Sequence, residues 1–327
     1  MDKYRPPYKI TDKMLDYISK IMEKVGEINS YINLNRMPEL RKQNRISSIH
    51  SSLAIENNQL SLFQVQDVIN GKMVIGDRTD IQEVKNAYEA YSKISEIDPY
   101  SIKDLKMIHG IMTFLIEKES GKFRSHGECV KDGDKVIFVA PSEKMVPSLM
   151  QDLFNWLKEV KENVHPLIYS SVFHYEFVFI HPFGDGNGRM ARLWQSALLS
   201  EWKEIFEYVP IESLIKEYQE EYYNVIGSCN KAGESTEFIE FMLKMINETI
   251  DRIILEQNSM QEIVYSNSTQ EKILELIRLD SYITQVEMAE KLGLTRDTIS
   301  YNIKYLKDNG IIERIGSTKK GSWRIIK

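Results

Sequence analysis

Apolar residues recur every three or four positions along most of the chain, a spacing typical of amphipathic helices. In residues 167–180 the apolar positions share one helical face, although β-branched and aromatic side chains leave a strand as the alternative. Turn-forming residues follow as far as Gly188, and residues 189–199 have the pattern of another helix. The sequence therefore predicts a mainly α protein with a helix, a loop and a helix around residues 181–188. The positions that share the face are Ile168, Val172, Tyr175 and Phe179.

The helical pattern fades over residues 258–267, which we expect to be a linker. Capping boxes at residues 268–271 and 284–287 predict the starts of two helices, and Thr295 caps a third. Two β-prone runs, 311–315 and 322–326, come next. Three helices followed by a two-stranded wing resemble a winged helix-turn-helix domain, expected over residues 268–327.

DNA is one candidate partner of this domain, and protein contacts, including those of a homodimer, are the alternative. Residues 268–327 carry eleven Lys and Arg against eight Asp and Glu, a net charge of +3, which leaves −9 for the rest of the chain. This is a modest positive charge for a DNA-binding domain. The side chains placed to contact DNA are Arg296, Thr298, Tyr301, Asn302 and Lys304 on the third helix and Lys319 and Lys320 in the wing.

Composition indicates an ordinary globular protein of 327 residues with a net charge of −6. This length predicts two or three domains, and hydrophobic residues make up 42% of the chain, enough for ordinary cores. The chain begins without an apolar signal core, and no apolar run is long enough to span a membrane. Its two cysteines give no disulfide framework. We therefore expect a cytoplasmic protein with no membrane contact.

The most informative segment is residues 181–192, which combine several groups that bind or activate phosphates. Gly186, Asn187 and Gly188 tolerate positive φ, so their backbone N–H groups can converge on an anion at the start of the next helix. Arg189 and Arg192 share a face of its first turn, where cations are disfavoured unless an anion compensates them. An ordinary capped loop would not explain this combination, and the spacing G-x-G-x-G does not match a dinucleotide fingerprint.

Two further residues of the segment supply chemistry. Asp185 is a natural ligand for the Mg²⁺ that accompanies a polyphosphate. His181 can accept a proton near neutral pH. These residues alone predict a nucleotide phosphate site and do not distinguish a sensor from a transferase.

The segment resembles the signature of the Fic family, H-P-F-x-(D/E)-G-N-G-R-x-x-R, at every fixed position. The resemblance implies a protein adenylyltransferase, which transfers AMP from ATP to a hydroxyl side chain of a target protein or of itself and releases pyrophosphate. It implies that His181 is the catalytic base and that Asp185 holds Mg²⁺. The nucleotide-binding residues would be Gly186, Asn187 and Gly188 at the α- and β-phosphates and Arg189 and Arg192 at the β- and γ-phosphates.

Gly188 bears on which phosphorus is attacked. The related Doc toxins have lysine at this position and transfer the γ-phosphate, so glycine favours AMP transfer. A phosphotransferase or another nucleotidyltransferase is the enzymatic alternative. The other alternative is a DNA-binding transcriptional regulator whose Fic-like domain senses nucleotide, although such a sensor has no need of a base such as His181.

A second element predicts autoinhibition. Glu56 lies at the end of a helix that starts near Pro38 and stops at Asn57, where its charge opposes the helix dipole unless a cation relieves it. Residues 52–57 also match the inhibitory motif (S/T)-x-x-x-E-(G/N) of many Fic proteins. The resemblance implies that Glu56 pairs with Arg192 and blocks the γ-phosphate, with Ser52 on the helix surface nearby.

A β-hairpin is predicted between these elements, because Asp132-Gly133 joins two short β-prone runs after Gly121-Lys122-Phe123-Arg124. Fic proteins have a hairpin flap at this distance from the motif that holds the target by strand addition. The alternative is a hairpin with no docking role, whose exposed edge the lysines would protect from aggregation. The apolar residues of the expected target-docking flap are Val136, Ile137, Phe138 and Val139.

Downstream, Tyr223 and Asn230 lie on a helix expected to begin near Ile211 and to end before Gly233. They resemble residues that line the adenosine pocket of some Fic proteins, although tyrosines in helices are often packed in the core. The complete expectation is an N-terminal helical region over 1–97, a Fic-type helical core over 98–257, the linker and the winged helix domain.

Overall fold

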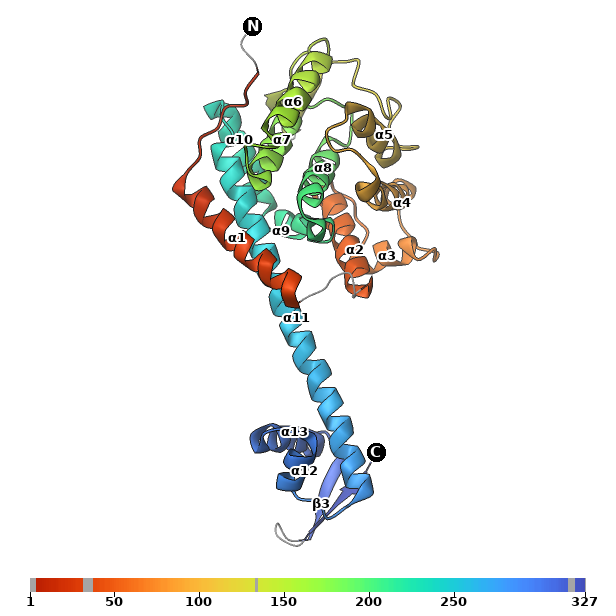
Figure 1. The fold of residues 1–327 in the computed structure, drawn as a ribbon. Coiled ribbons are helices and arrows are strands. Elements are labelled where there is room, and N and C mark those ends of the chain that lie inside the picture. The colour runs from red at the N-terminus through yellow and green to blue at the C-terminus, as the bar shows by residue number, and fades with distance from the viewer. Residues whose placement is uncertain (1–3, 32–37, 133–134, 317–320, 327) are drawn as a thin grey trace. The chain divides into compact units, whose positions relative to one another are not determined.

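The computed structural model describes residues 4–31, 38–132, 135–316 and 321–326 (Figure 1). The backbone is predominantly helical and forms two compact units, Met1–Asp251 and Arg252–Lys327. The expected boundary after residue 97 does not separate compact units, because helices from both sides of it pack together in the first unit. Among the described residues, no helix has the length and apolar character needed to cross a membrane.

Two helices form the centre of the first unit, and the loop between them carries the phosphate motif. α7 (Pro166–Ile180) and α8 (Asn187–Trp202) pack against each other, and α6 (Val146–Val160) packs on α7. Nearly all side chains of α7 are buried, which confirms a helix where the sequence also allowed a strand. The sequence predicts one apolar face for α7, but its buried surface is wider, because a helix covered on several sides is apolar all round.

N-terminal helices cover α8 (Figure 1). α2 (Pro38–Ile55) contacts α8 and also α4 (Arg78–Ser92), and α5 (Ile102–Met112) contacts both α4 and α8. Asn57 has a φ of 69° and ends α2 in the left-handed conformation, as predicted. Other elements of this unit are α1 (Asp12–Tyr31), α3 (Leu62–Ile69), the 3-10 turns η2 (Ile94–Glu96) and η3 (Glu204–Glu207), and the hairpin strands β1 (Cys129–Asp132) and β2 (Lys135–Val139).

The helix expected to begin near Ile211 is two helices, α9 (Ile211–Glu217) and α10 (Gln219–Ala232). Tyr218 separates them with non-helical backbone angles, and neither glycine nor proline marks the break in the sequence. α10 ends at Gly233, whose φ of 70° makes it a left-handed C-cap, as expected.

The linker expected at residues 258–267 is helical, because these residues belong to the long helix α11 (Thr236–Leu279). The capping box expected to start a helix at residue 268 is likewise inside α11, and that prediction is wrong. α11 contains neither glycine nor proline, so polar residues alone do not end it.

The second unit has the predicted winged helix-turn-helix arrangement. Thr284 opens α12 (Gln285–Leu292) with a capping box, and Thr295 caps α13 (Arg296–Asp308), both as predicted. β3 (Ile312–Ile315) and β4 (Ser322–Ile325) pair antiparallel, while the wing lysines Lys319 and Lys320 lie outside the described residues.

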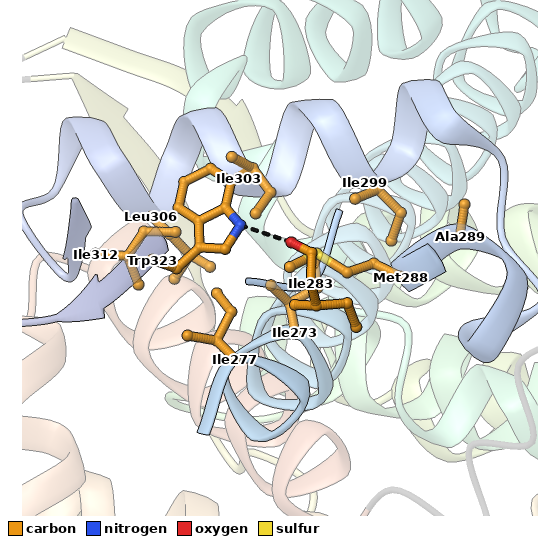
Figure 2. Close-up of a cluster of buried hydrophobic side chains, with 10 residues drawn as sticks. All are labelled: Ile273, Ile277, Ile283, Met288, Ala289, Ile299, Ile303, Leu306, Ile312 and Trp323. Atoms are coloured by element: carbon orange, nitrogen blue, oxygen red, sulfur yellow. Dashed lines mark hydrogen bonds between the residues drawn. The ribbon is translucent and has the colours of Figure 1, made fainter. Parts of the chain in front are cut away.

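An apolar cluster holds the second unit together (Figure 2). Trp323 of β4 is buried in it and donates its indole N–H to the carbonyl of Ile283 at 3.0 Å. This bond satisfies the one polar group of a large buried side chain. The other members are Ile273, Ile277, Met288, Ala289, Ile299, Ile303, Leu306 and Ile312.

Candidate active site

The loop between α7 and α8 is folded back on itself by two left-handed residues. His181 ends α7 with a φ of 51°, and Gly186 precedes α8 with a φ of 77°. The buried Asn187 side chain closes the loop, since its Oδ1 accepts from the Phe183 N–H at 3.0 Å and its Nδ2 donates to the Phe183 carbonyl at 2.8 Å. The Asn187 side chain therefore shapes the loop, and its main-chain N–H is available to an anion.

His181 is oriented with one imidazole nitrogen available for proton transfer. Its Nδ1 lies 3.3 Å from the carbonyl oxygen of Val178, which can only accept, so Nδ1 carries the proton. Nε2 is then the basic nitrogen. Burial lowers the pKa of His181 below its ordinary value, so the imidazole is neutral at neutral pH.

His109, which the sequence analysis did not single out, supports this loop from α5. Its Nδ1 accepts from the Gly121 N–H at 2.9 Å, and its Nε2 donates to the Asp185 carbonyl at 3.0 Å. Its ring also stacks on Phe183 with 3.6 Å between the ring centroids. Burial lowers the pKa of His109 to about 4, so the side chain stays neutral and fixed in one tautomer. No local signal in the sequence links residues 109 and 185.

Asp185 and Arg189 form an ion pair at the start of α8. Asp185 Oδ2 accepts from Arg189 Nη2 at 2.7 Å, and its Oδ1 accepts from the Gly186 N–H at 2.6 Å. Burial opposes ionisation of Asp185, but Arg189 outweighs it and lowers the pKa of this carboxyl group. Asp185 is thus an ionised, half-exposed carboxylate suited to a cation held jointly with phosphate oxygens. No cluster of three or more potential metal ligands occurs within the described residues.

Glu83 of α4 is a second carboxylate at Arg189, and no pattern in the sequence points to it. Its Oε1 accepts from Arg189 Nη1 at 2.8 Å, and its Oε2 accepts from Asn58 Nδ2 at 2.8 Å. Asn58 follows Glu56 by two residues. Glu83 therefore connects the segment after α2 with the first arginine of the motif.

Arg192 contacts the end of α2 through three hydrogen bonds. Its Nη2 donates to Glu56 Oε1 at 2.8 Å and to the Ser52 carbonyl at 2.9 Å, and its Nε donates to Ser52 Oγ at 3.0 Å. The Arg192 side chain is 1% exposed and that of Glu56 32%. Burial favours the neutral guanidine, but the Glu56 carboxylate outweighs burial and keeps the pKa of Arg192 above its ordinary value. The contact expected between these two residues is present.

The remaining N–H donor of Arg192 lies at the motif backbone. Its Nη1 is buried and has no hydrogen-bond acceptor among the residues that the structure describes. Gly188 is adjacent, since a Cβ atom there would lie 3.1 Å from Nη1. An unsatisfied cationic donor beside the first turn of a helix is suited to bind an anion.

The C-terminal end of α2 is also held by α9 and α10. Lys216 Nζ donates to the Ala54 carbonyl at 2.8 Å, and Gln219 Nε2 donates to the Ile55 carbonyl at 3.0 Å. The Lys216 ammonium and the Arg192 guanidinium compensate two negative groups, the C-terminal end of the α2 dipole and the Glu56 carboxylate. These contacts explain how Glu56 is accommodated at this position.

The two residues expected at an adenosine pocket differ in their surroundings. Tyr223 is half exposed on α10, while Asn230 accepts from the Tyr175 hydroxyl at 2.8 Å through its Oδ1. The neighbouring Tyr222 is a core residue whose hydroxyl lies 3.0 Å from His174 Nε2. Tyr223 therefore remains available to a ligand, whereas the carbonyl of Asn230 already has a partner.

The predicted hairpin is present, with β1 and β2 antiparallel and Cys129 opposite Val139. Phe138 packs against Phe179 of α7, with 5.4 Å between ring centroids, while Val139 is 70% exposed. Phe138 therefore anchors the hairpin. The side chains of Val136 and Ile137 lie outside the described part of the chain.

Replacing Gly188 by alanine tests how tightly α2 and α8 fit. A methyl group there would collide with Glu56 Oε1, so Gly188→Ala should displace the carboxylate from Arg192 and lower the free energy of unfolding by about 1–3 kcal/mol. Urea denaturation measures this change. In the Glu56→Gly background only the tight approach to Arg192 Nη1 remains, and the same substitution should cost clearly less. An equal loss in both backgrounds would contradict the proposed clash.

Comparison with known proteins agrees with the site. Residues 99–199 match the Fic/DOC family, and residues 266–313 match a winged helix-turn-helix DNA-binding family. Proteins named protein adenylyltransferase Fic are 27% identical over 256 residues in Nematostella vectensis and over 250 residues in Drosophila melanogaster. The alignments cover 74% and 73% of this chain but 56% and 46% of those proteins, so the chain spans about half the length of these curated relatives.

Solved structures extend the likeness to the whole chain. A Fic family protein from Desulfovibrio desulfuricans is 36% identical, with a TM-score of 0.74 and coverage of 99% of this chain and 98% of that one. Fic-1 from C. elegans shares the fold over 76% of this chain and 73% of its own, with a TM-score of 0.65 at 23% identity. Together with the complete motif, the full-length match shows that this chain belongs to the Fic family.

Proposed function

We propose that the chain is a protein adenylyltransferase that transfers AMP from ATP to a hydroxyl side chain of a target protein or of itself, releasing pyrophosphate. The curated relatives bear the name of this activity. The observation that carries the proposal is the buried Nη1 of Arg192 beside Gly188, which has no acceptor among the described residues, on the same motif as a histidine whose Nδ1 faces a carbonyl and leaves Nε2 as the basic nitrogen.

The phosphates would bind at the start of α8. α8 begins at Asn187, and the first N–H groups of a helix lack intrahelical acceptors, so those from Asn187 to Arg189 would be available to an anion. Arg189 and Arg192 would neutralise the phosphate oxygens, and Asp185 would hold Mg²⁺, which supplies further neutralisation when bound. Among the described residues, Arg192 Nη1 and Arg189 Nε are both buried donors without an acceptor.

His181 would serve as the general base. Nε2 accepts the proton of the target hydroxyl as its oxygen attacks the α-phosphorus, and the bond from this phosphorus to the β-phosphate bridging oxygen breaks. The neutral imidazole is ready for this role because burial keeps its pKa low. Asn187 and His109 keep the loop in place through their contacts with Phe183 and Asp185.

Glu56 would restrain the reaction. Its carboxylate uses Nη2 of Arg192 and lies against Gly188, where the outer phosphates of ATP would bind. A carboxylate at this position repels phosphate oxygens and occupies the Nη2 donor of Arg192 that they would otherwise use. Ser52 reinforces the arrangement through its hydroxyl and carbonyl oxygens.

The test is to follow each phosphorus of ATP. The Glu56→Gly variant would be incubated with Mg²⁺ and ATP labelled at the α- or the γ-phosphate, alone and with a cell lysate. AMP transfer places α-label on protein and leaves γ-label in pyrophosphate. Protein-bound γ-label would instead indicate phosphotransfer, and no bound label from either substrate would favour a nucleotide sensor.

The match to a DNA-binding family supports a second activity, DNA binding by the winged helix. Arg296, Tyr301 and Lys304 are exposed on α13 and available to a groove. Asn302 is not, because it is 3% exposed and donates to the Thr298 carbonyl, so its expected role in DNA contact is wrong.

A lysine substitution tests DNA binding. If Lys304 contacts a phosphate, Lys304→Ala should weaken binding to duplex DNA of mixed sequence and reduce the salt dependence by about one unit of slope. Fluorescence anisotropy at several salt concentrations measures both quantities. Unchanged binding, or no binding by the wild type, would favour a protein partner for this unit.

A further inference from the structure

A buried arginine outside the motif contacts both His181 and the base of the hairpin. Arg124 is 3% exposed, and its Nε donates to the His181 carbonyl at 2.7 Å. Nη1 donates to the His126 carbonyl at 2.7 Å, and Nη2 to the Pro141 carbonyl. Nη2 also lies 3.5 Å from the Ile180 carbonyl oxygen. All four acceptors are main-chain carbonyl oxygens.

On the motif side, Arg124 caps the C-terminal end of α7. The last carbonyl groups of a helix lack intrahelical donors and form the negative end of its dipole, so a guanidinium there is favourable. The main-chain N–H of Arg124 donates to the Pro182 carbonyl at 2.9 Å, so Arg124 also binds the residue after His181. These bonds favour the left-handed conformation of His181, from which the imidazole extends.

On the other side, Arg124 fixes the base of the hairpin. His126 and Pro141 flank the two strands, and the Ala140 N–H donates to the Glu128 carbonyl at 3.1 Å across the same base. One planar guanidinium therefore bonds to both ends of the hairpin and to His181. Lysine could not do the same, because its three donors radiate from a single nitrogen.

We infer that Arg124 is a positioning residue that sets the β1–β2 hairpin at a fixed distance from His181. A target segment that adds as a strand to this hairpin would then present its hydroxyl group to Nε2 in a defined place. The effect of Arg124 on catalysis rests on the proposed function. The coupling between the hairpin and the 181–186 loop does not, because it can be tested without measuring AMP transfer.

Hydrogen exchange followed by mass spectrometry tests the coupling in the full chain. In Arg124→Lys, the amides of residues 129–132 and 135–139 and those of His181 and Phe183 should exchange together at least about fivefold faster, while those of α4 should not change. Arg45→Lys, a matched change at a largely buried arginine on α2, should leave both segments as in the wild type. Faster exchange in one segment alone, or in neither, would overturn the inference.

A reciprocal variant covers the case in which Arg124→Lys destabilises the whole unit. Ala140→Pro removes the N–H that closes the hairpin base and leaves Arg124 and α7 unchanged. If Arg124 couples the two parts, exchange at 181–183 should still increase. A change confined to the hairpin would contradict the coupling.

Kinetics separate positioning from a general loss of structure. In the Glu56→Gly background, Arg124→Lys should lower kcat for AMP incorporation by about tenfold and change the KM for ATP by less than about twofold, because Arg124 does not contact the phosphate site. A parallel loss of ATP affinity would indicate a merely structural role. If Glu56→Gly incorporates no AMP at all, the proposed function fails, and the exchange experiment still decides the role of Arg124.

Discussion

Glu56→Gly should incorporate AMP at least about tenfold faster than the wild type, because the charge-assisted contact it removes is worth about 1.5–3 kcal/mol. The substitution frees Nη2 of Arg192 and clears the space beside Gly188. Ser52 still binds the guanidinium, so Arg192 stays oriented towards the start of α8. Incorporation of α-labelled AMP per minute, with Mg²⁺ and saturating ATP, measures the effect.

Two matched variants define what the result means. Glu39→Gly also exchanges a glutamate for glycine in α2, but at its exposed first turn, and should leave the rate unchanged. Glu56→Gly/Arg192→Ala removes both partners and should be inactive, because the phosphates then lack the guanidinium. If Glu56→Gly were no faster than the wild type although it bound ATP, Glu56 would not be the restraint.

Local patterns explain why much of the site was predictable. The residues of 181–192 are contiguous, so their chemistry could be read without a fold, and the loop and its flanking helices are confirmed. The Glu56–Arg192 contact spans 136 residues and came from the family resemblance. The end of α2 at Asn57 came from local turn preference and is also confirmed.

The residues that were missed act across the fold. His109, Glu83 and Arg124 reach the motif from other parts of the chain, and each contacts a main-chain carbonyl or a motif side chain there. Because every residue type has a main-chain carbonyl, the residue type at that position gives no sign of the contact. The Asn187 side chain acts in the same way, since its partners are the main-chain groups of Phe183.

Helix ends were least predictable where polar residues mimic a boundary. Residues 258–267 have the composition of a linker, but without glycine or proline the helix α11 continues through them. The break at Tyr218 shows the opposite case, because a helix ends there without any local signal.

Removing the proposed base should have the largest effect of all. In the Glu56→Gly background, His181→Ala should lower the rate of AMP incorporation by about 10²–10⁴-fold, the usual contribution of a general base. ATP affinity should stay nearly the same, because the phosphates would contact α8 and the arginines rather than His181. Stopped-flow or quench-flow measurement of AMP transfer, together with calorimetric ATP titration, separates the two quantities. Loss of ATP binding would mean that the variant had disturbed the loop and had not simply removed the base.

The pH dependence gives an independent check on the same residue. His181 must be neutral to accept a proton, and burial lowers its pKa below the ordinary value of about 6.5. Arg124 acts in the same direction, while Glu128 and Glu56 raise the pKa, so Glu56→Gly should lower it further. The AMP-transfer rate of Glu56→Gly should therefore stay level as pH falls through neutrality and decline only below about pH 6.5. Rates measured between about pH 5 and 9 should show this acid limb in Glu56→Gly and lose it in Glu56→Gly/His181→Ala. A limb with its midpoint above neutrality, or one that persists without the imidazole, would assign the proton transfer to another group.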